Sequence, residues 1–256
     1  MQKNKKTEPL SVLILGGTKG IGLSIAKAFL NEGNIVNIIS RNEAPLLFRH
    51  LNKLYLNRVF MYKCDVTDID KLTIVRRKIL NNSSDKIDVV ICNVGNGSGS
   101  SLAIQETKEW NTSWNINFTS TYNATKVFSE DLVKTYGNII FISSIAGCEF
   151  IGAPVSYSVA KSSIIAYAKS LSHKLSPNVR VNVIAPGNIM IKDGVWDLKQ
   201  KKNPEIIKKM LNDKVPLKRF GRPEEVADLV LFISSSKASF ITGGCFIIDG
   251  GQTVKF

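Results

Sequence analysis

The chain has 256 residues, of which 44% are hydrophobic and 21% are charged, and its 34 basic against 21 acidic side chains give a formal net charge of +13. This composition excludes collagen-like, coiled-coil and intrinsically disordered proteins, and the sequence contains no apolar run of roughly 18 residues, the length that a membrane span needs. The lysines are spread thinly without interleaved aromatic side chains, so we expect no nucleic-acid partner. The charge is then a solvated surface, or it attracts an anionic substrate.

The four cysteines, Cys64, Cys92, Cys148 and Cys245, lie far apart in apolar stretches. Neither a CxxC pair nor a zinc-type spacing is present, so we expect small core residues in a reducing compartment, no disulfide framework and no metal site. The basic start of the chain is followed by an apolar stretch, residues 10–15, that is too short for a signal peptide. We therefore expect a cytoplasmic protein without a membrane segment.

Seven short runs rich in Val and Ile, each apolar on both faces, predict the strands of a parallel sheet that is covered on both sides. They lie at residues 11–15, 35–39, 58–62, 87–91, 138–142, 179–183 and 245–248. Between them, apolar residues at three- and four-residue spacing predict helices, most clearly at 21–29, 155–171 and 226–233. This alternation indicates a single-domain Rossmann-type α/β fold over residues 1–256, a doubly wound parallel sheet of about seven strands with helices on both faces.

The stretch from residue 190 to 220 breaks this rhythm. It contains Gly194, Trp196, a cluster of lysines and a short helical pattern at 205–211. An insertion of this length after a strand is usually functional or mobile. We expect a substrate loop or lid here, with a plain surface helix as the alternative.

The first predicted strand runs into residues 16–22, Gly-Gly-Thr-Lys-Gly-Ile-Gly, and a helix follows. A phosphate placed there would meet free backbone N–H groups and the positive end of the helix dipole, and glycine is needed where a Cβ would block the turn. A glycine loop alone is weak evidence, but its place after the first buried strand indicates a dinucleotide site. The residues expected to contact the cofactor here are Gly16, Thr18, Lys19, Gly20, Ile21 and Gly22.

The end of the second predicted strand indicates which dinucleotide binds. An acid at this point selects the ribose 2′-hydroxyl of NAD, whereas a cation accommodates the 2′-phosphate of NADP. The chain has Arg41 and no acid there, and Lys19 lies in the glycine loop. Two cations favour NADP(H), although Arg41 could also be an ordinary surface charge at a helix start.

Tyr157 and Lys161 lie near the start of a predicted helix, and their four-residue spacing puts phenol and ammonium on one face. A fixed cation would draw the pKa of the phenol down towards the range that general acid–base catalysis prefers. The spacing alone is weak evidence, since it occurs by chance in many helices. Ser144 strengthens it, because it follows the fifth strand at the sheet edge where ligands bind; its neighbour Ser143 is expected to be structural.

Other candidates lie at the same edge. Asn93 and Gly95 follow the fourth strand and are expected to contact the cofactor. Asn117 lies among apolar residues of a helical stretch, and the simplest interpretation is a buried amide with satisfied hydrogen bonds. Asp65, followed by Val66, comes directly after the third strand and either caps a turn or contacts the adenine. Neither histidine has a nucleophile signature nearby, so a hydrolase triad is not expected.

Taken together, these residues resemble the short-chain dehydrogenase/reductase family over nearly the whole chain. The glycine turn is similar to the family's TGxxxGIG motif with Leu15 in place of Thr, and residues 92–95 resemble its NNAG motif with two departures. A PG motif follows the sixth strand, with Ile191 where a Thr is often found, and the tail from 221 to 251 is also typical. The resemblance implies a catalytic set of Asn117, Ser144, Tyr157 and Lys161, and cofactor contacts from Pro186, Gly187 and Ile189.

The resemblance also implies a mechanism. Tyr157 would donate a proton to a substrate oxygen while NADPH delivers hydride to the carbonyl carbon. Lys161 would lower the pKa of Tyr157 and bind the nicotinamide ribose, and Ser144 would hold the carbonyl oxygen. Asn117 would anchor a water that links Lys161 to solvent. Tyr157 and Lys161 thus belong to both the catalytic and the cofactor-binding sets.

Within the family the chain is most similar to 3-oxoacyl-[acyl-carrier-protein] reductases, so the resemblance implies a small-molecule or carrier-bound ketone as substrate. Those enzymes tend to carry cations near the mouth of the site; Lys134 matches one such position, whereas residues 176–178 offer no cation. A sugar, a polyol or another small carbonyl compound is the alternative substrate, and a non-catalytic NADP(H)-binding protein is the alternative function. Family members are commonly homotetramers, so we expect a homotetramer or a homodimer.

Overall fold

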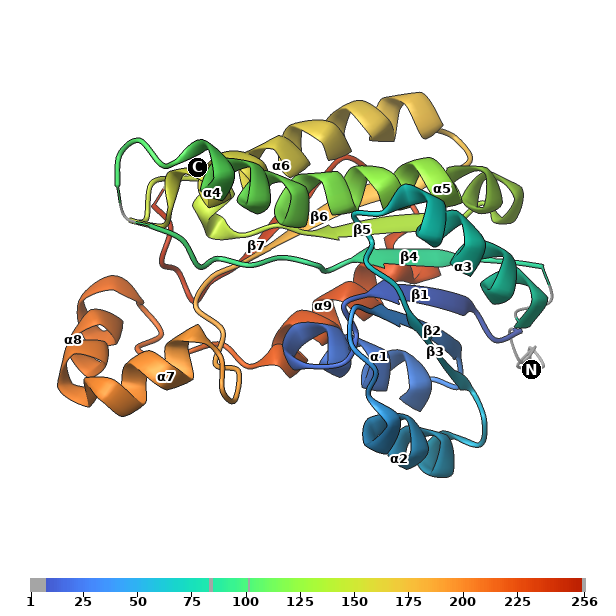
Figure 1. Ribbon diagram of the computed structural model, residues 1–256, viewed down its shortest axis with the longest axis horizontal. Helices are drawn as coiled ribbons and strands as arrows, with labels where there is room; N and C mark the ends of the chain where they lie inside the picture. The colour runs from blue at the N-terminus through green and yellow to red at the C-terminus, as the bar shows by residue number, and fades with distance from the viewer. Residues whose placement is uncertain (1–7, 83–84, 101, 255–256) are drawn as a thin grey trace.

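The structure, a computed structural model, describes residues 8–82, 85–100 and 102–254. Within them, seven strands form one parallel sheet in the order β3-β2-β1-β4-β5-β6-β7 (Figure 1). The strands are β1 (Ser11–Leu15), β2 (Ile35–Ser40), β3 (Val59–Lys63), β4 (Val89–Cys92), β5 (Asn138–Ile142), β6 (Arg180–Pro186) and β7 (Cys245–Ile248). This is the predicted single Rossmann-like α/β domain.

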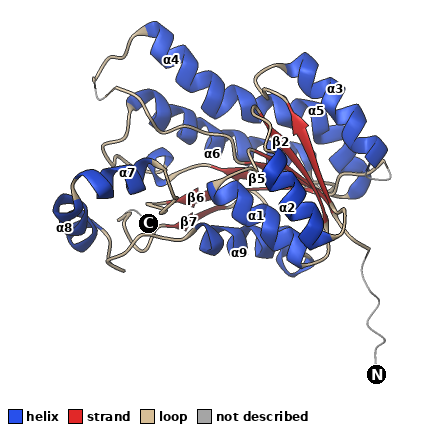
Figure 2. Cartoon of the chain, turned by 60° about the horizontal axis from the view of Figure 1, so that its bottom comes forward, coloured by secondary structure: helices blue, strands red, loops and turns tan. Residues whose placement is uncertain are grey.

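Helices cover both faces of the sheet, with α1, α2 and α9 on one side and α3, α5 and α6 on the other (Figures 1 and 2). The α-helices are α1 (Gly20–Asn31), α2 (Pro45–Tyr55), α3 (Ile69–Asn82), α4 (Thr107–Trp114), α5 (Ser120–Thr135), α6 (Val155–Leu175), α7 (Val195–Lys202), α8 (Pro204–Lys214) and α9 (Pro223–Ser234). A π-helix, η1 (Asn115–Thr119), joins α4 to α5, and two 3₁₀ turns, η2 (Ile145–Gly147) and η3 (Ser236–Ala238), follow β5 and α9.

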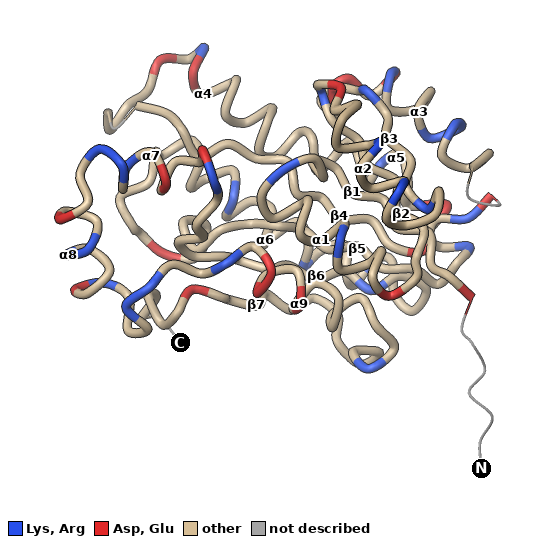
Figure 3. The backbone as a smooth tube through the Cα atoms, turned by 90° about the horizontal axis from the view of Figure 1, so that it is seen from below, with Lys and Arg blue, Asp and Glu red and all other residues tan. Residues whose placement is uncertain are grey.

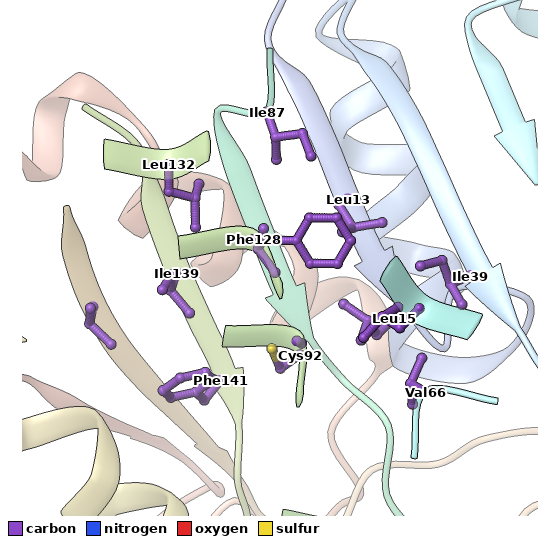
Figure 4. Close-up of a cluster of buried hydrophobic side chains, with 14 of the residues drawn as sticks. Leu13, Leu15, Ile39, Val66, Ile87, Cys92, Phe128, Leu132, Ile139 and Phe141 are labelled. Atoms are coloured by element: carbon purple, nitrogen blue, oxygen red, sulfur yellow. The ribbon is translucent and has the colours of Figure 1, made fainter. Parts of the chain in front are cut away.

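Each face of the sheet has its own apolar core because successive strand residues point to opposite sides. In β1, Leu13 and Leu15 pack on the side of α3, α5 and α6, whereas Val12 and Ile14 pack on the side of α1 and α9. Figure 4 shows the first of these cores, where Phe128 of α5 lies among the strand side chains. The continuous apolar runs read from the sequence are thus explained by burial on two sides.

All seven strands occur where the sequence predicts them. Those at 11–15, 138–142 and 245–248 coincide with the prediction, β2 differs by one residue at one end, β3 differs by one residue at each end, and β4 and β6 differ at both ends by one to three residues. The three clearest helical patterns correspond to α1, α6 and α9, and the short pattern at 205–211 corresponds to α8.

β7 is an exception to burial on both faces. Its side chains alternate, with Cys245 exposed and Ile247 43% exposed, because β7 is the edge strand. The prediction that the cysteines are core residues is therefore only half right: Cys64 and Cys92 are buried, whereas Cys148 is half-buried and Cys245 exposed.

The segment 190–220 projects from the end of the sheet as the helix pair α7 and α8 (Figures 1 and 2). The sequence did not predict α7. None of the α7 side chains is buried, so its sequence lacks the apolar periodicity by which a helix is predicted. In α8 only Ile207 is buried.

Lys and Arg are distributed over many elements with Asp and Glu among them (Figure 3). Among the described residues, no helix combines the length and the apolar character that crossing a bilayer requires. The described part of the chain also holds no group of three His, Cys, Asp or Glu side chains arranged to bind a metal ion.

Candidate active site

The order of the strands reverses at β1, which has β2 on one side and β4 on the other. Leu15, the last residue of β1, pairs with Ile39 and with Cys92, so the loops that follow three strands start at the same sheet edge. In open α/β sheets, ligands bind at this switch point, outside the carboxyl ends of the strands. The predicted site residues follow these strands.

The glycine turn between β1 and α1 is tightly built. Gly16 has a φ of +82° and Gly20 a φ of +53°, in the region that suits glycine. A Cβ at Gly22 would lie 2.1 Å from the carbonyl oxygen of Gly16, so only glycine allows this approach. Asn93, at the end of β4, donates from Nδ2 to the same oxygen at 2.8 Å. The side chain of Asn93 therefore holds the turn in place.

The first turn of α1 is open to an anion. Lys19 occupies the N-cap with an extended backbone, no side chain caps the helix, and no acid lies in the first turn. The first backbone N–H groups and the positive end of the dipole thus remain available for a phosphate. A glycine-rich turn at a free helix N-terminus fits the pyrophosphate of a dinucleotide. Thr18 and Ile21 lie in this turn and are partly exposed, as a contact with a ligand requires.

Arg41 follows β2 and is exposed. The nearby acid Glu43 forms an ion pair with Lys63, whose Nζ lies 3.3 Å from Oε1 of Glu43. Among the described residues, no carboxylate forms an ion pair with Arg41. Asp65 accepts from the backbone N and the Oγ1 of Thr67, at 3.0 and 2.8 Å. It therefore caps a turn, one of the two roles considered for it, and Val66 beside it is buried.

Lys161 and Tyr157 lie one turn apart on α6. The Nζ of Lys161 is 5.9 Å from the centroid of the Tyr157 ring and donates to the carbonyl oxygen of Ile142, at the end of β5, at 3.0 Å. Ser144 begins η2, where its Oγ accepts from the backbone N of Ala146 at 3.2 Å. The predicted Ser144, Tyr157 and Lys161 are thus brought together from β5 and α6.

Ser143, the neighbour of Ser144, is buried and donates from Oγ to the carbonyl oxygen of Lys161 at 2.8 Å. This contact ties β5 to α6 inside the protein, so Ser143 is structural as expected.

Burial governs the pKa values of the pair. It lowers the pKa of the Lys161 ammonium to about 8. It also raises the pKa of the Tyr157 phenol, and a hydrogen bond with Ser144 opposes this rise. The pKa of Tyr157 is thus raised overall, opposite to the expected lowering, because burial of the phenol is the largest influence on it. Tyr157 is therefore held in its protonated form at neutral pH.

Asn117 lies in the π-helix between α4 and α5 and is fully buried. Its Oδ1 accepts from the backbone N of Asn96 at 2.9 Å, and its Nδ2 donates to the carbonyl oxygens of Ser113 and Asn96 at 2.9 and 3.1 Å. The amide is thus satisfied, as the simplest interpretation predicted. A Cβ built on Gly95 would lie 2.9 Å from Nζ of Lys161 and 3.1 Å from Oδ1 of Asn117, so both polar groups border this glycine.

The predicted contacts after β6 lie at the same edge of the sheet. Pro186 ends β6, and the N–H of Gly187 donates to the carbonyl oxygen of Ile248 at 2.9 Å. Ile189 is buried. Ile191, which replaces the expected Thr, lies over the glycine turn, because a Cβ on Gly20 would be 3.0 Å from its Cδ1.

Sequence reasoning missed the loop that covers this site, described over residues 95–100 and 102–106. Its backbone rests against the phenol, since a Cβ on Gly97 would lie 3.5 Å from Cζ of Tyr157. The loop is irregular and exposed, so it carries no hydrophobic period that would have revealed it.

Comparison with known proteins identifies the family. A family model described as "Enoyl-(Acyl carrier protein) reductase" matches residues 16–253. The 3-oxoacyl-[acyl-carrier-protein] reductase of Chlamydia trachomatis is 34% identical over 246 residues, which are 94% of this chain and 96% of that protein. This chain belongs to the short-chain dehydrogenase/reductase family. As a short-chain dehydrogenase/reductase it is an oxidoreductase, and the resemblance read from its motifs is confirmed.

Solved structures of short-chain dehydrogenases/reductases agree with this fold. A 3-oxoacyl-[acyl-carrier protein] reductase with bound NAD from Brucella melitensis has a TM-score of 0.84 and 30% identity, and the match covers 98% of this chain and 94% of the other. ElxO with NADP bound has a TM-score of 0.88 and 29% identity, and the match covers 95% of this chain and 98% of the other. Solved structures similar to this chain thus have either NAD or NADP bound.

Proposed function

We propose that this short-chain dehydrogenase/reductase uses NADP(H) to reduce a ketone to a secondary alcohol, with a 3-oxoacyl thioester on a carrier as the substrate class. The observation that carries the proposal is the convergence of Ser144, Tyr157 and Lys161 beside the glycine turn of α1. The similarity to 3-oxoacyl-[acyl-carrier-protein] reductases supports the substrate class. A sugar, polyol or other small carbonyl substrate is the alternative.

The glycine turn, Asn93, Gly95 and the segment from Pro186 to Ile189 would hold the cofactor, and Asp65 and Val66 would flank its adenine. The exposed Arg41 and Lys19 support the choice of NADP(H), because they are cations that follow β2 and β1, and a cation near the end of β2 accommodates a 2′-phosphate. When bound, the nicotinamide supplies the hydride.

The protein's own residues supply the proton. Tyr157 donates its phenolic proton to the substrate oxygen as negative charge develops there, and its raised pKa keeps that proton in place at neutral pH. Ser144 donates a hydrogen bond to the same oxygen. Lys161, charged below its pKa of about 8, stabilises the phenolate left behind and binds the ribose. Asn117 would anchor a water beside Lys161, which fits the position of both groups around Gly95.

The test is turnover of NADPH with acetoacetyl-CoA as the 3-oxoacyl probe. The substitution Tyr157→Phe removes the proton and leaves the ring, so kcat should fall by a factor of about 10² to 10⁴. Tyr136→Phe is the matched control, because that side chain is 75% exposed and lies at the far end of α5. Unchanged turnover in Tyr157→Phe would refute the mechanism. Binding of NADPH without reduction of any ketone would favour the non-catalytic alternative.

We also propose a homotetramer that works in the cytoplasm. Exposed apolar side chains on α6 and next to β7 support the assembly, and the buried, reduced Cys64 and Cys92 support a reducing compartment.

A further inference from the structure

The loop between β4 and α4 has almost no apolar anchor. Among its described residues from 95 to 106, Gln105 alone is buried, at 9% exposure, whereas Leu102 and Ile104 are 61% and 89% exposed. A cavity of about 550 Å³ separates the loop from α4, bordered by Asn96 and Ser98 on one side and by other polar side chains on the other. Polar contacts, and not packing, must therefore hold this loop against Tyr157.

Gln105 supplies the contact with the catalytic helix. Its Oε1 accepts from the backbone N–H of Ser156 at 2.8 Å, in a buried hydrogen bond. That N–H is one of the four at the start of α6 that have no partner within the helix. The N-cap of α6 is Pro154, which offers no side-chain acceptor. Gln105 thus caps α6 from a distant loop, at the residue directly before Tyr157.

Glu109 of α4 holds the other end of the amide. Its Oε1 accepts from Nε2 of Gln105 at 2.7 Å and also from the backbone N–H of Ser100. The same carboxylate therefore fixes two points of the loop. Glutamine is needed at position 105 because the side chain must accept at one end and donate at the other.

The contacts form one chain from α4 to the active site. Gly99 lies between α4 and the start of α6, since a Cβ built on it would be 3.0 Å from Oε1 of Glu109 and 3.2 Å from Cβ of Pro154. Two residues earlier, the backbone at Gly97 rests on the ring of Tyr157. Breaking the Gln105–Glu109 contact would therefore have two effects: it would release the loop from the ring of Tyr157, and it would weaken the cap that Gln105 forms on α6.

We propose that Gln105, oriented by Glu109, is a positioning residue that keeps loop residues 95–100 and 102–106 closed over Tyr157 and so determines how tightly the ketone is held. The proposal rests on the reductase function proposed above for its kinetic readout. Gln105 acts through Ser156 and the loop backbone.

The test compares three variants in the NADPH and acetoacetyl-CoA assay. In Gln105→Glu, two carboxylates face each other without a donor, and KM for the ketone should rise about tenfold while KM for NADPH stays within about threefold. Glu109→Gln should show a smaller rise, because its amide oxygen still accepts from Gln105 and Ser100 but carries no charge. The exchanged pair, Gln105→Glu with Glu109→Gln, restores a donor–acceptor contact between the two side chains but gives up the acceptor for Ser100, so KM should return to the level of Glu109→Gln alone.

A second readout is independent of activity. Hydrogen exchange followed by mass spectrometry should show faster exchange in residues 95–106 and 155–157 of Gln105→Glu, and recovery in the exchanged pair. Gln200→Glu is the matched control, since that glutamine is exposed on α7. If Gln105→Glu does not fold, Glu109→Gln and the exchanged pair carry the comparison.

The outcomes separate the two proposals. A wild-type protein that reduces no ketone refutes the reductase function, and the closed loop is then judged by hydrogen exchange alone. Wild-type KM and wild-type exchange in Gln105→Glu refute the role of Gln105 and leave the reductase function standing. A loss of kcat without a change in KM or exchange, or a pair that fails to recover, also refutes the positioning role.

Discussion

Lys161 is a buried ammonium whose main described partner is the carbonyl oxygen of Ile142. Its pKa in the folded protein, about 8, is below its usual value of 10.5 because burial disfavours the charge. In the range between these values the unfolded chain binds more protons than the folded one, so this group makes stability rise with pH from about 8 to 10.5. Below pH 8 the full cost of the buried charge is present.

Replacing Lys161 by an uncharged side chain should therefore stabilise the cofactor-free protein and at the same time abolish turnover. We expect Lys161→Met to raise the free energy of unfolding at pH 7 by about 1–3 kcal/mol, since the shifted pKa is worth about 3 kcal/mol and loss of the hydrogen bond to Ile142 offsets about 1. The gain should shrink as the pH approaches 10. Urea unfolding at pH 7 and pH 10 measures it, and a variant less stable than the wild type at pH 7 would contradict the account.

Arg41 is predicted to determine the choice of cofactor. Arg41→Asp replaces the cation by the acid that favours a free 2′-hydroxyl, so affinity for NADPH should fall about 10- to 100-fold while affinity for NADH is kept or improved. Quenching of protein fluorescence during titration measures both constants. Arg49→Asp, an equal change of charge at another exposed arginine on α2, should leave the ratio unchanged. Tighter binding of NADH than NADPH by the wild type would show the argument wrong.

The sequence was enough to propose the candidate site residues because their signals are local. Tyr157 and Lys161 share a helix face by spacing alone, and Ser144 and Asn93 follow strands whose carboxyl ends must meet at one edge. The pKa of Tyr157 could not be found in this way, because it depends on burial by a loop that comes from a distant part of the sequence. The same is true of Gln105, whose partners are Glu109 and a backbone N–H in another helix.

At the scale of elements, an ion pair joins α3 to α5. Arg76 donates to both carboxylate oxygens of Asp131 at 2.5 Å, and Asp131 is 3% exposed. Arg76→Met would leave that carboxylate buried without its cation, which should cost about 3–5 kcal/mol of stability. Adding Asp131→Asn removes the stranded charge and should recover much of the loss. Urea unfolding of both variants gives the comparison, and a single variant as stable as the wild type would contradict it.

Element types followed the sequence at the seven strands and at α1, α6 and α9, whereas α2 and α3 were not singled out. The pattern failed at α7, which buries nothing, and at the π-helix around Asn117, which continues the helical pattern of α4 and α5. A π-turn inserts one extra residue into a helix, and such turns often lie at functional sites. Here it brings the side chain of Asn117 against the backbone of Asn96 at the base of the covering loop.

At the scale of the whole molecule, the parallel sheet explains why one edge carries the site. Each strand ends at this edge, so residues that follow six strands meet there although they are far apart in the sequence. On the outer surfaces, by contrast, some apolar side chains remain exposed in a single chain. On α6, Val155 and Val159 are 41% and 39% exposed, and Phe240, just before the edge strand β7, is fully exposed.

These two apolar regions predict the assembly. Two different self-complementary surfaces on one chain generate a tetramer with three twofold axes, whereas one surface gives only a dimer. We expect the wild type to sediment as a tetramer, and Val159→Asp and Phe240→Asp each to reduce it to a dimer by burying a charge in one interface. The double variant should be a monomer. Leu46→Asp is the control, because Leu46 is 76% exposed on α2, away from both regions, and it should not change the mass. Sedimentation equilibrium at micromolar concentration decides, and a monomeric wild type would exclude both interfaces.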